Sequence, residues 1–352
     1  LDDALTYGIR FEPPDVNAGE YQFVPIDRAT IRYGLGGVKG TGESAINEIL
    51  RARASGPFAS LYDFCRRVNL QIVNRRSIEA LVKAGAFDRL HENRASVLAS
   101  VAQALMAAER ALANAGQNSL FDDEAAVDPP LIQAQPWPLL EALAQEKSAL
   151  GLYLSGHPFE AWRDHLAPMA TLTLARAEPS ETRHRVAGIV NAVRVMNART
   201  GRMCFVTLDD RTDVREIMLP ANLFEAHRHW LREDIPVVME VRINTNRDGE
   251  PRLIAEQIHD IEQARALFGR RVVIHLNGSS AAEDARRTLA TLRTFAGDGP
   301  AGTLPVTIQL ERTSNASSPG LPGYGGRISL GESLRVVPRT ELFSQLNATL
   351  EF

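Results

Sequence analysis

Cysteine is scarce in this sequence, and the two that are present have no metal-ligating neighbours. Cys65 and Cys204 lie far apart, and neither has a Cys or His at the short spacing of a zinc site. We therefore predict no metal site at either residue. Both cysteines read as buried, reduced thiols of a protein from the cytoplasm, where disulfides are rare.

Long apolar runs are also missing. The sequence has no stretch of about 18 or more apolar residues, so we expect no membrane-spanning helix and no membrane partner. A basic segment followed by an apolar one, as in a secretion signal, is absent from the start. The chain begins at Leu1 rather than Met, and its opening reads as the middle of a segment. We therefore expect it to be a piece of a longer chain.

The sequence also lacks an overall excess of positive charge. The net charge of −4 argues against a uniformly basic nucleic-acid binder. The charge is unevenly distributed, however. Basic residues outnumber acidic ones two to one from Arg28 to Arg94, whereas residues 122–128 are acidic. This distribution predicts one anion-binding domain followed by an acidic linker.

A length of 352 residues predicts about two to three domains, and the patterns along the chain indicate their order. Asn74 suits the N-cap of one helix, and Gly116 suits the C′ position of another. Residues 117–138 are rich in Asp, Gln and Pro, which is typical of an extended linker. Apolar residues at helical spacing predict helices at Ser44–Ala54, Leu61–Val68, Arg75–Ala84, Arg94–Ala115 and Leu139–Tyr153.

From Arg185 onwards the pattern changes from helices to strands. The expected order is β-β-β-α-β-β, with an Asp-Gly hairpin turn at Asn246–Gly249. This is the order of an OB-fold barrel, whose exposed face often binds single-stranded nucleic acid. A small α/β domain is expected after about residue 270. The fold class predicted for the whole chain is therefore multidomain α+β.

A glycine-rich turn, with glycines at positions 36, 37, 40 and 42, is the sharpest local signal. Such a turn exposes successive backbone N–H groups, and the start of the next helix adds further N–H groups and a positive dipole end. Together these groups form a socket for one phosphate. We predict the hairpin of a helix-hairpin-helix module, which binds the DNA backbone without reading bases. Lys39 can add a point charge to this socket.

Two alternatives apply to this motif. A nucleotide-binding P-loop is disfavoured, because Lys39 is followed by Gly40 rather than by the Ser or Thr that binds magnesium. An ordinary flexible glycine turn stays open. A second, weaker hairpin between helices contains Lys83 and Gly85; taken alone, it is more typical of a helix C-cap. The two hairpins together favour a tandem module.

Three blocks make the sequence resemble one family. "IRYGLGGVKGTG" at residues 31–42, "NRRSIEALVKAGAFD" at residues 74–88 and "GLYLSGHP" at residues 151–158 look like the alpha subunit of bacterial DNA polymerase III, a C-family replicative polymerase. The resemblance runs over the whole chain. It implies duplex contacts in both hairpins, at Gly37, Lys39, Gly40, Gly42, Lys83 and Gly85. Arg75 and Arg76 match basic positions of the family and are expected phosphate contacts, although an ordinary solvated helix face is an equal alternative.

The resemblance also implies a domain order and an absence. The palm domain, with its catalytic carboxylates and Mg²⁺, would lie upstream, so the fragment itself would have no catalytic residues and no cofactor. The implied segments are a tail of the fingers region at 1–29, a tandem helix-hairpin-helix domain at 30–116, a clamp-binding linker at 117–138, a helical connector at 139–184, an OB-fold at 185–262 and a domain that binds the clamp-loader tau subunit at 263–352.

The linker contains a candidate motif for the sliding clamp (beta). Gln117, Leu120 and Phe121 are similar to the family's internal clamp-binding motif. Such a segment docks by burying its apolar pair in a pocket while the Gln amide fixes the register. The alternative is that Leu120 and Phe121 fold back on the neighbouring helix.

The expected barrel has candidate contacts for single-stranded DNA at Arg194, Arg202 and Phe205, because arginine beside an exposed aromatic is typical of single-strand binding. Asp209, Asp210 and Asp213 lie nearby in sequence and would repel a phosphate backbone, so a purely structural barrel is equally favoured. Two rival functions stay open for the chain: the same region of an error-prone C-family polymerase, and a stand-alone DNA-binding adaptor.

Overall fold

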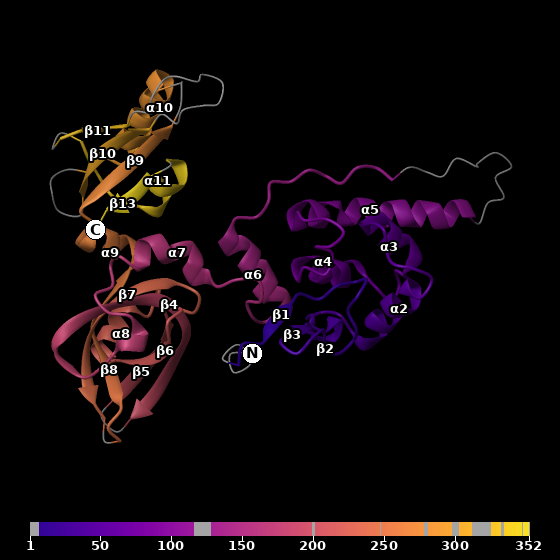
Figure 1. The fold of residues 1–352 in the computed structure, drawn as a ribbon, viewed down its shortest axis with the longest axis horizontal. Helices are drawn as coiled ribbons and strands as arrows, with labels where there is room; N and C mark the ends of the chain where they lie inside the picture. The colour runs from indigo at the N-terminus through magenta and orange to yellow at the C-terminus, as the bar shows by residue number, and fades with distance from the viewer. Residues whose placement is uncertain are drawn as a thin grey trace. The chain divides into compact units, whose positions relative to one another are not determined.

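The structure is a computed structural model, and it describes residues 7–115, 128–198, 201–246, 248–277, 281–297, 303–311, 325–331, 334–346 and 348–351. The chain forms two compact units, residues 1–161 and 162–352 (Figure 1). The division falls within helix α7 (Pro158–Leu166). Each unit has its own elements and its own core.

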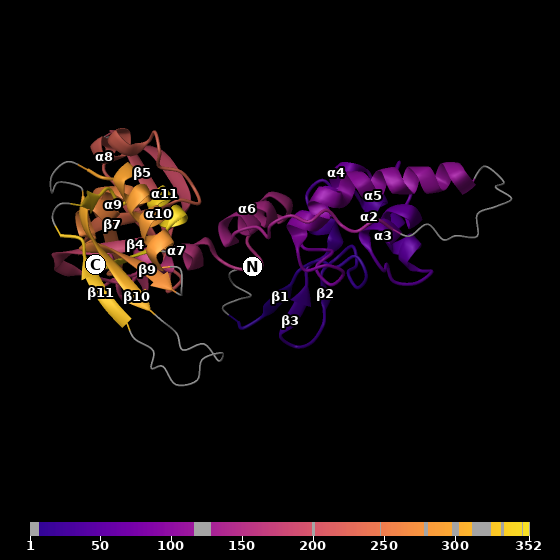
Figure 2. The ribbon, with the colours of Figure 1, turned by 90° about the horizontal axis from the view of Figure 1, so that it is seen from above.

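The first unit combines a small sheet with a group of helices. The sheet has the order β1-β3-β2, and Figure 2 shows it on one side of the unit with α4 and α5 on the other. The helices predicted in this unit before residue 116 are confirmed to within one residue at each end. The elements are β1 (Arg10–Glu12), β2 (Val24–Pro25), β3 (Thr30–Arg32), η1 (Leu35–Gly37), α2 (Glu43–Arg53), α3 (Leu61–Arg67), α4 (Arg75–Lys83), α5 (Arg94–Ala115) and α6 (Leu139–Leu150).

The apolar faces of these helices meet in one core. Ile49 of α2, Phe64 of α3 and Ile78 of α4 are completely buried. The rings of Phe58, Phe64 and Phe87 meet edge to face, with successive centroids 4.8 and 5.1 Å apart. These helices are therefore fixed by packing rather than by local propensity alone.

Part of the predicted linker is bound to the first unit as an extended strap, residues 128–134. The Ile132 N–H donates to Ser100 Oγ (2.8 Å), and the Ala134 N–H donates to Ser96 Oγ (3.1 Å). Both serines are completely buried on α5. At the start of the strap, Arg66 of α3 donates two hydrogen bonds to the Asp128 carboxylate.

The second unit begins with a closed five-stranded barrel in the order β4-β5-β6-β8-β7. A helix, α8, lies between the third and fourth strands in sequence, so the predicted order β-β-β-α-β-β is confirmed. Leu174 and Ala177 join the barrel core, whereas α6 packs in the first unit. The expected connector 139–184 is therefore divided between the two units. The barrel elements are η2 (Leu174–Arg176), β4 (Ser180–Ala198), β5 (Gly201–Asp209), β6 (Val214–Leu219), α8 (Ala221–His227), β7 (Pro236–Thr245) and β8 (Pro251–Asp260).

The remainder of the second unit is a mixed sheet with helices. The sheet runs β11-β10-β9-β13, and β12 also pairs with β10. The last strand was not predicted. Thr349 pairs with Val273 of β9, so the end of the chain is part of the sheet. The elements are α9 (Ile261–Phe268), β9 (Arg271–Asn277), α10 (Ala281–Thr294), β10 (Leu304–Glu311), β11 (Gly325–Ser329), β12 (Arg335–Val336), α11 (Thr340–Gln345) and β13 (Ala348–Glu351).

Candidate nucleic-acid interface

The first hairpin, residues 35–42, is anchored at one end and exposed at the other. Leu35 and Val38 are buried in the core of the first unit. Lys39, Gly40 and Gly42 are exposed. Gly40 has a φ of +86°, in the left-handed region that glycine adopts without a steric penalty. The glycine pattern therefore produces the predicted tight, solvent-facing turn.

Several amides of this hairpin are already bonded within the protein. The Gly37 N–H donates to the Gly34 carbonyl (3.0 Å), and the Lys39 N–H donates to the Ala149 carbonyl at the end of α6 (2.7 Å). The Gly37 amide is thus not available to a phosphate, which corrects the expectation for that residue. Packing gives a second reason for the glycine, because a Cβ there would lie 2.5 Å from the Tyr33 ring.

The amides at the tip of the hairpin differ from these in their hydrogen bonding. Among the described residues, the N–H groups of Gly40 and Gly42 have no acceptor, and both residues are exposed. The amides of Glu43 and Ser44, in the first turn of α2, also lack an intrahelical acceptor. These unbonded N–H groups lie where the sequence predicts a phosphate socket. The Glu43 carboxylate opposes an incoming phosphate, although it complements the helix dipole.

The start of α4 lies beside the same turn. Ser77 Oγ donates to the Gly40 carbonyl (3.1 Å), and the Asn74 side chain caps α4 by accepting from the Ser77 N–H (3.0 Å), as predicted. Arg76 Nε lies 3.9 Å from the position that a Cβ on Gly40 would occupy. No pattern in the sequence predicts this long-range contact. It brings a second helix N-terminus and a guanidinium next to the exposed amides.

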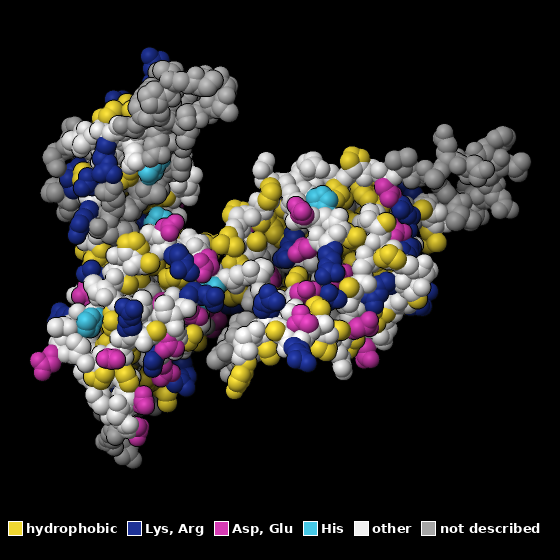
Figure 3. Space-filling model, in the orientation of Figure 1, with side chains coloured by type: hydrophobic (Ala, Val, Ile, Leu, Met, Phe, Trp, Pro, Cys, Tyr) yellow, Lys and Arg dark blue, Asp and Glu magenta, His cyan; other side chains and the backbone are white. Residues whose placement is uncertain are grey.

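Most cations of the basic segment are used in ion pairs. Arg75, for example, donates to Glu79 at 2.7 Å. Figure 3 shows dark blue and magenta side chains interspersed on the visible face of the first unit. No carboxylate of the described residues pairs with Lys39, Arg76 or Lys83. The basic segment is therefore mainly a network of structural ion pairs: Arg32–Glu12, Arg51–Glu48, Arg53–Glu20, Arg66–Asp128, Arg67–Asp63, Arg75–Glu79, Arg89–Glu12, Arg89–Asp15 and Arg94–Asp88.

The Lys39 side chain lies beside the end of α6. Its Nζ lies 2.8 Å from where a Cβ on Gly151 would be, at the C-terminal end of α6. A cation there complements the negative end of the helix dipole. The Lys39 side chain is exposed all the same, so its charge contributes to the potential around the hairpin tip.

The second hairpin is a helix cap. The Gly85 N–H donates to Val82 O (3.0 Å), and the Ala86 N–H donates to Leu81 O (2.9 Å), which is the Schellman pattern. Gly85 is buried with a φ of +85°, and a Cβ there would collide with the Arg94 guanidinium. The expectation that Gly85 offers an amide to phosphate is corrected. Lys83, which is half-buried, could contribute only its side chain.

A second candidate surface lies on the outside of the barrel. Phe205 of β5 is paired with Arg194 of β4 on one side and with Met218 of β6 on the other. The Arg194 guanidinium lies 5.6 Å from the Phe205 ring centroid and also pairs with Glu216 at 2.7 Å. Arg252 lies 3.3 Å from Met218 Sδ. Four strands thus contribute neighbouring side chains to this surface, with Arg194 over the Phe205 ring and Arg252 against Met218.

Two of the three acidic residues expected to oppose this surface have another role. Asp209, the last residue of β5, and Asp210 are buried. The third, Asp213, forms an ion pair with Arg215 at 2.7 Å. Asp210 accepts from the Thr212 and Leu174 N–H groups at 2.9 and 2.7 Å, and Asp209 accepts from the Arg211 N–H at 2.8 Å. These carboxylates stabilise the turn and η2, so their charges are not on the outer face beside Phe205.

Some predicted contacts lie outside what the structure describes. Gln117, Leu120 and Phe121 are outside the described residues, and of Arg202 only the backbone is described, within β5. In the described part of the chain, no group of three or more His, Cys, Asp or Glu residues is arranged to bind a metal. No helix there is long and apolar enough to cross a membrane.

Comparison with known proteins first gives the class of the first unit. A family model for the helix-hairpin-helix motif matches residues 8–97, which include the small sheet, the first hairpin and the start of α5. This part of the first unit therefore matches the helix-hairpin-helix motif. The match begins earlier than residue 30, so the sheet is included with the helices.

Curated relatives then give the family. The chain is 36% identical over 355 residues to the DNA polymerase III subunit alpha of Neisseria meningitidis serogroup B, and 34% and 31% identical to those of Vibrio cholerae and Escherichia coli K12. Each match covers 99% of this chain and 30% of the relative. The chain belongs to the DNA polymerase III alpha subunit family, and it spans about 30% of the length of these relatives.

The solved structures with a similar fold match only about a quarter of this chain. An OBody bound to hen egg-white lysozyme is 20% identical with a TM-score of 0.22, covering 26% of this chain and 93% of that one. The mitochondrial single-stranded DNA binding protein Rim1 of S. cerevisiae is 10% identical with a TM-score of 0.21, covering 22% of this chain and 92% of that one. No conclusion follows from likenesses this low; the barrel assignment comes from the strand order.

Proposed function

We propose that this chain is the C-terminal, DNA-binding and partner-docking region of a replicative DNA polymerase III alpha subunit, and that its first unit binds the backbone of duplex DNA. The observation behind this proposal is the group of exposed, unbonded amides at Gly40, Gly42 and the start of α2, with Arg76 beside them. Unbonded N–H groups at a helix start, with a guanidinium beside them, suit a phosphate. Membership of the family supports the same function.

The proposal is tested by measuring the affinity of the whole chain for two duplexes of unrelated sequence over a range of salt concentrations. Backbone binding predicts equal affinities and a linear fall of log K with log salt. A strong preference for one sequence, or an affinity that does not change with salt, would contradict it. Mixing the chain with primed template, Mg²⁺ and nucleotides should give no primer extension, because we propose that the polymerase carboxylates lie in another part of the parent enzyme.

We propose single-stranded DNA as the partner of the barrel. The Phe205 ring offers a stacking surface, Arg194 lies over it, and Arg252 lies beside the neighbouring Met218. The structural role of Asp209 and Asp210 weakens the electrostatic objection, although Glu216 pairs with Arg194. Replacing Phe205 with Ala should lower single-strand affinity about fivefold or more, because base stacking is lost. The duplex affinity of the same variant is the control and should not change; equal losses for both DNAs would contradict the assignment.

We also propose that Gln117, Leu120 and Phe121 bind the sliding clamp, and that the sheet domain after residue 263 binds the clamp-loader tau subunit. These proposals are supported by the sequence resemblance and by family membership. Association with the cytoplasmic replication machinery follows from the same proposals.

A further inference from the structure

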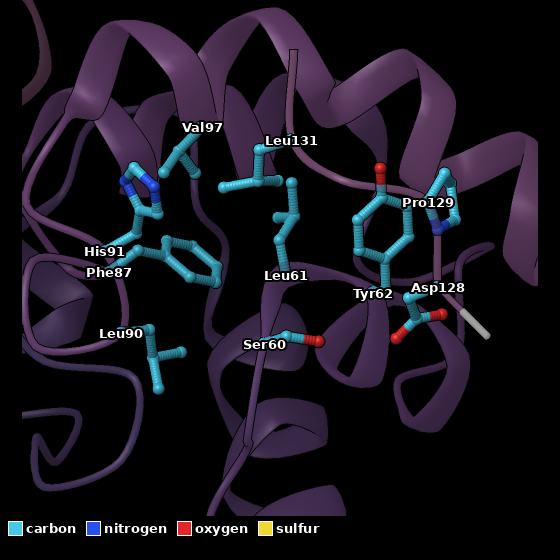
Figure 4. A pocket seen from close by; sticks show the side chains of 10 residues that line it. All are labelled: Ser60, Leu61, Tyr62, Phe87, Leu90, His91, Val97, Asp128, Pro129 and Leu131. Atoms are coloured by element: carbon cyan, nitrogen blue, oxygen red, sulfur yellow. The ribbon is translucent and has the colours of Figure 1, made fainter. Parts of the chain in front are cut away.

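A cavity of about 230 Å³ lies inside the first unit, away from the first hairpin. Its walls come from α3, the turn after α4, the start of α5 and the strap. In Figure 4, Tyr62 stands at one end beside Asp128 and Pro129, and Phe87 and Val97 stand toward the other end. None of these residues belongs to the proposed DNA contacts.

Most of the lining is apolar. Leu61, Phe87 and Val97 are buried core residues, and Leu131 of the strap packs against the same core. An apolar cavity of about 150 Å³ is large enough to bind benzene. A volume of about 230 Å³ is therefore suited to two fused six-membered rings. The cavity is too small for the larger ligands that typical pockets of about 300–1,000 Å³ accommodate.

One polar group in the lining is not satisfied. Tyr62 is only 3% exposed, and its hydroxyl has no hydrogen-bond partner among the described residues. The neighbouring groups do not supply one. Both oxygens of the Asp128 carboxylate accept from Arg66, and Pro129 has no N–H. A buried hydroxyl without a partner is unfavourable, so an acceptor brought by a ligand would stabilise the complex.

We infer that this cavity binds a flat bicyclic aromatic molecule with one hydrogen-bond acceptor, which the Tyr62 hydroxyl recognises. The rings lie between the apolar walls, and the acceptor lies at the Tyr62 end beside the strap. Because Pro129 closes off that end, the strap adjusts when the ligand binds. The hydrogen bonds from Ile132 to Ser100 and from Ala134 to Ser96 then report on occupancy.

A matched pair of probes tests this inference. Quinoline and naphthalene have nearly the same shape, and only quinoline has an acceptor nitrogen. Titrated into the whole chain and followed by NMR, both should saturate, with quinoline binding roughly fivefold more tightly. The amide resonances of Ile132 and Ala134 should shift on binding. In the Tyr62→Phe variant, which keeps the ring and loses the hydroxyl, the two probes should bind with equal affinity.

Other results would overturn the inference. If neither probe saturates, the hydroxyl is satisfied by solvent and the cavity is not a ligand site. A preference for quinoline that survives in Tyr62→Phe would place the probe elsewhere. A second variant, Leu131→Trp, fills the cavity from the strap and should abolish binding of both probes; unchanged binding in this variant would also contradict the inference. Thermal melting of each variant confirms that it is folded.

Discussion

Single residues decide which of the candidate contacts can meet DNA. Arg75 and Arg76 are neighbours in sequence and equivalent by motif, but their surroundings differ. Arg75 pairs with Glu79 at 2.7 Å, whereas Arg76 lies beside the Gly40 turn without a carboxylate partner in the described structure. An ion pair must be broken before its cation can fully neutralise a phosphate. Arg76 is therefore the better candidate for a phosphate contact.

The first prediction contrasts these two arginines. Arg76→Gln should weaken duplex binding about fivefold for every sequence and should lower the slope of log K against log salt by about one, because one phosphate contact is lost. Arg75→Gln is the matched control, with a smaller effect. Both are measured by fluorescence anisotropy with duplex DNA. A larger loss for Arg75→Gln would reverse the assignment.

The hairpin residues also show which features of the site could be predicted from the sequence. The turn at Gly40, the N-cap at Asn74 and the exposed position of Lys39 are local features, so they could be predicted from neighbouring residues. The loss of the Lys39 amide could not, because its acceptor, the Ala149 carbonyl, is on a helix far along the chain. The Gly37 amide is bonded locally to the Gly34 carbonyl in a short 3-10 turn, which the glycine pattern alone does not distinguish from an open turn. Gly85 was misread because a hairpin glycine and a Schellman glycine look alike in sequence.

At the scale of elements, the helices and barrel strands were predicted well because their apolar periodicity is strong. The small sheet β1-β3-β2, helix α9 and strand β13 were missed. These elements are short, and they are stabilised by pairing with distant segments rather than by their own pattern. The strap was expected only as an extended linker. Its binding depends on Ser96 and Ser100, which a sequence reading places on an ordinary helix face.

Contacts between elements of the second unit predict a pH effect. His165 of α7 packs on Phe343 of α11, with ring centroids 5.4 Å apart. Arg265 of α9 is buried, with its guanidinium 4.4 Å from the same Phe343 ring. Burial and, secondly, the Arg265 charge lower the pKa of His165 to about 4. The folded unit therefore favours the neutral form of the His165 imidazole.

The sign of the effect follows from linkage. A folded-state pKa below the ordinary value of 6.5 means that the unfolded chain binds the proton first. The stabilisation is complete above pH 6.5 and is lost as the pH falls toward 4. Between pH 7 and pH 4.5, wild type should lose on the order of 1–2 kcal/mol more stability than His165→Phe, after allowance for partial exposure.

Chemical denaturation at the two pH values measures this difference. The His165→Phe variant keeps an aromatic ring against Phe343 and removes the titrating group. His229→Gln, at an exposed position, is the control and should behave as wild type does. Equal acid sensitivity in wild type and His165→Phe would show that His165 does not titrate as described.

For the whole molecule, the proposed activities are tethering activities. A chain that contacts duplex DNA, single-stranded DNA and a sliding clamp makes each new encounter with DNA effectively intramolecular, which raises the effective concentration. The proposed clamp motif is close in sequence to the strap, whose start is attached to α3 through Arg66 and Asp128. The first unit and the clamp would therefore stay close together.

The clamp proposal predicts separable functions. Replacing Leu120 and Phe121 with Ala should abolish clamp binding, because the apolar anchor is lost, and should leave duplex affinity unchanged. Calorimetric titration with purified clamp measures the first effect, and anisotropy with duplex DNA measures the second. Clamp affinity equal to that of wild type would refute the motif assignment. A loss of both activities would point to a folding defect instead.

The most direct test of the central claim removes a single backbone hydrogen. Gly42 has a φ of −84°, close to the range that a proline ring imposes, and a Cβ there would meet only Ser44 Oγ, at 3.9 Å. Gly42→Pro deletes the N–H without changing any charge, whereas Gly42→Ala keeps it. Measured on the same duplex, Gly42→Pro should bind about tenfold more weakly than Gly42→Ala, with equal thermal stability. Equal duplex affinities for the two folded variants would contradict phosphate binding by the hairpin amides.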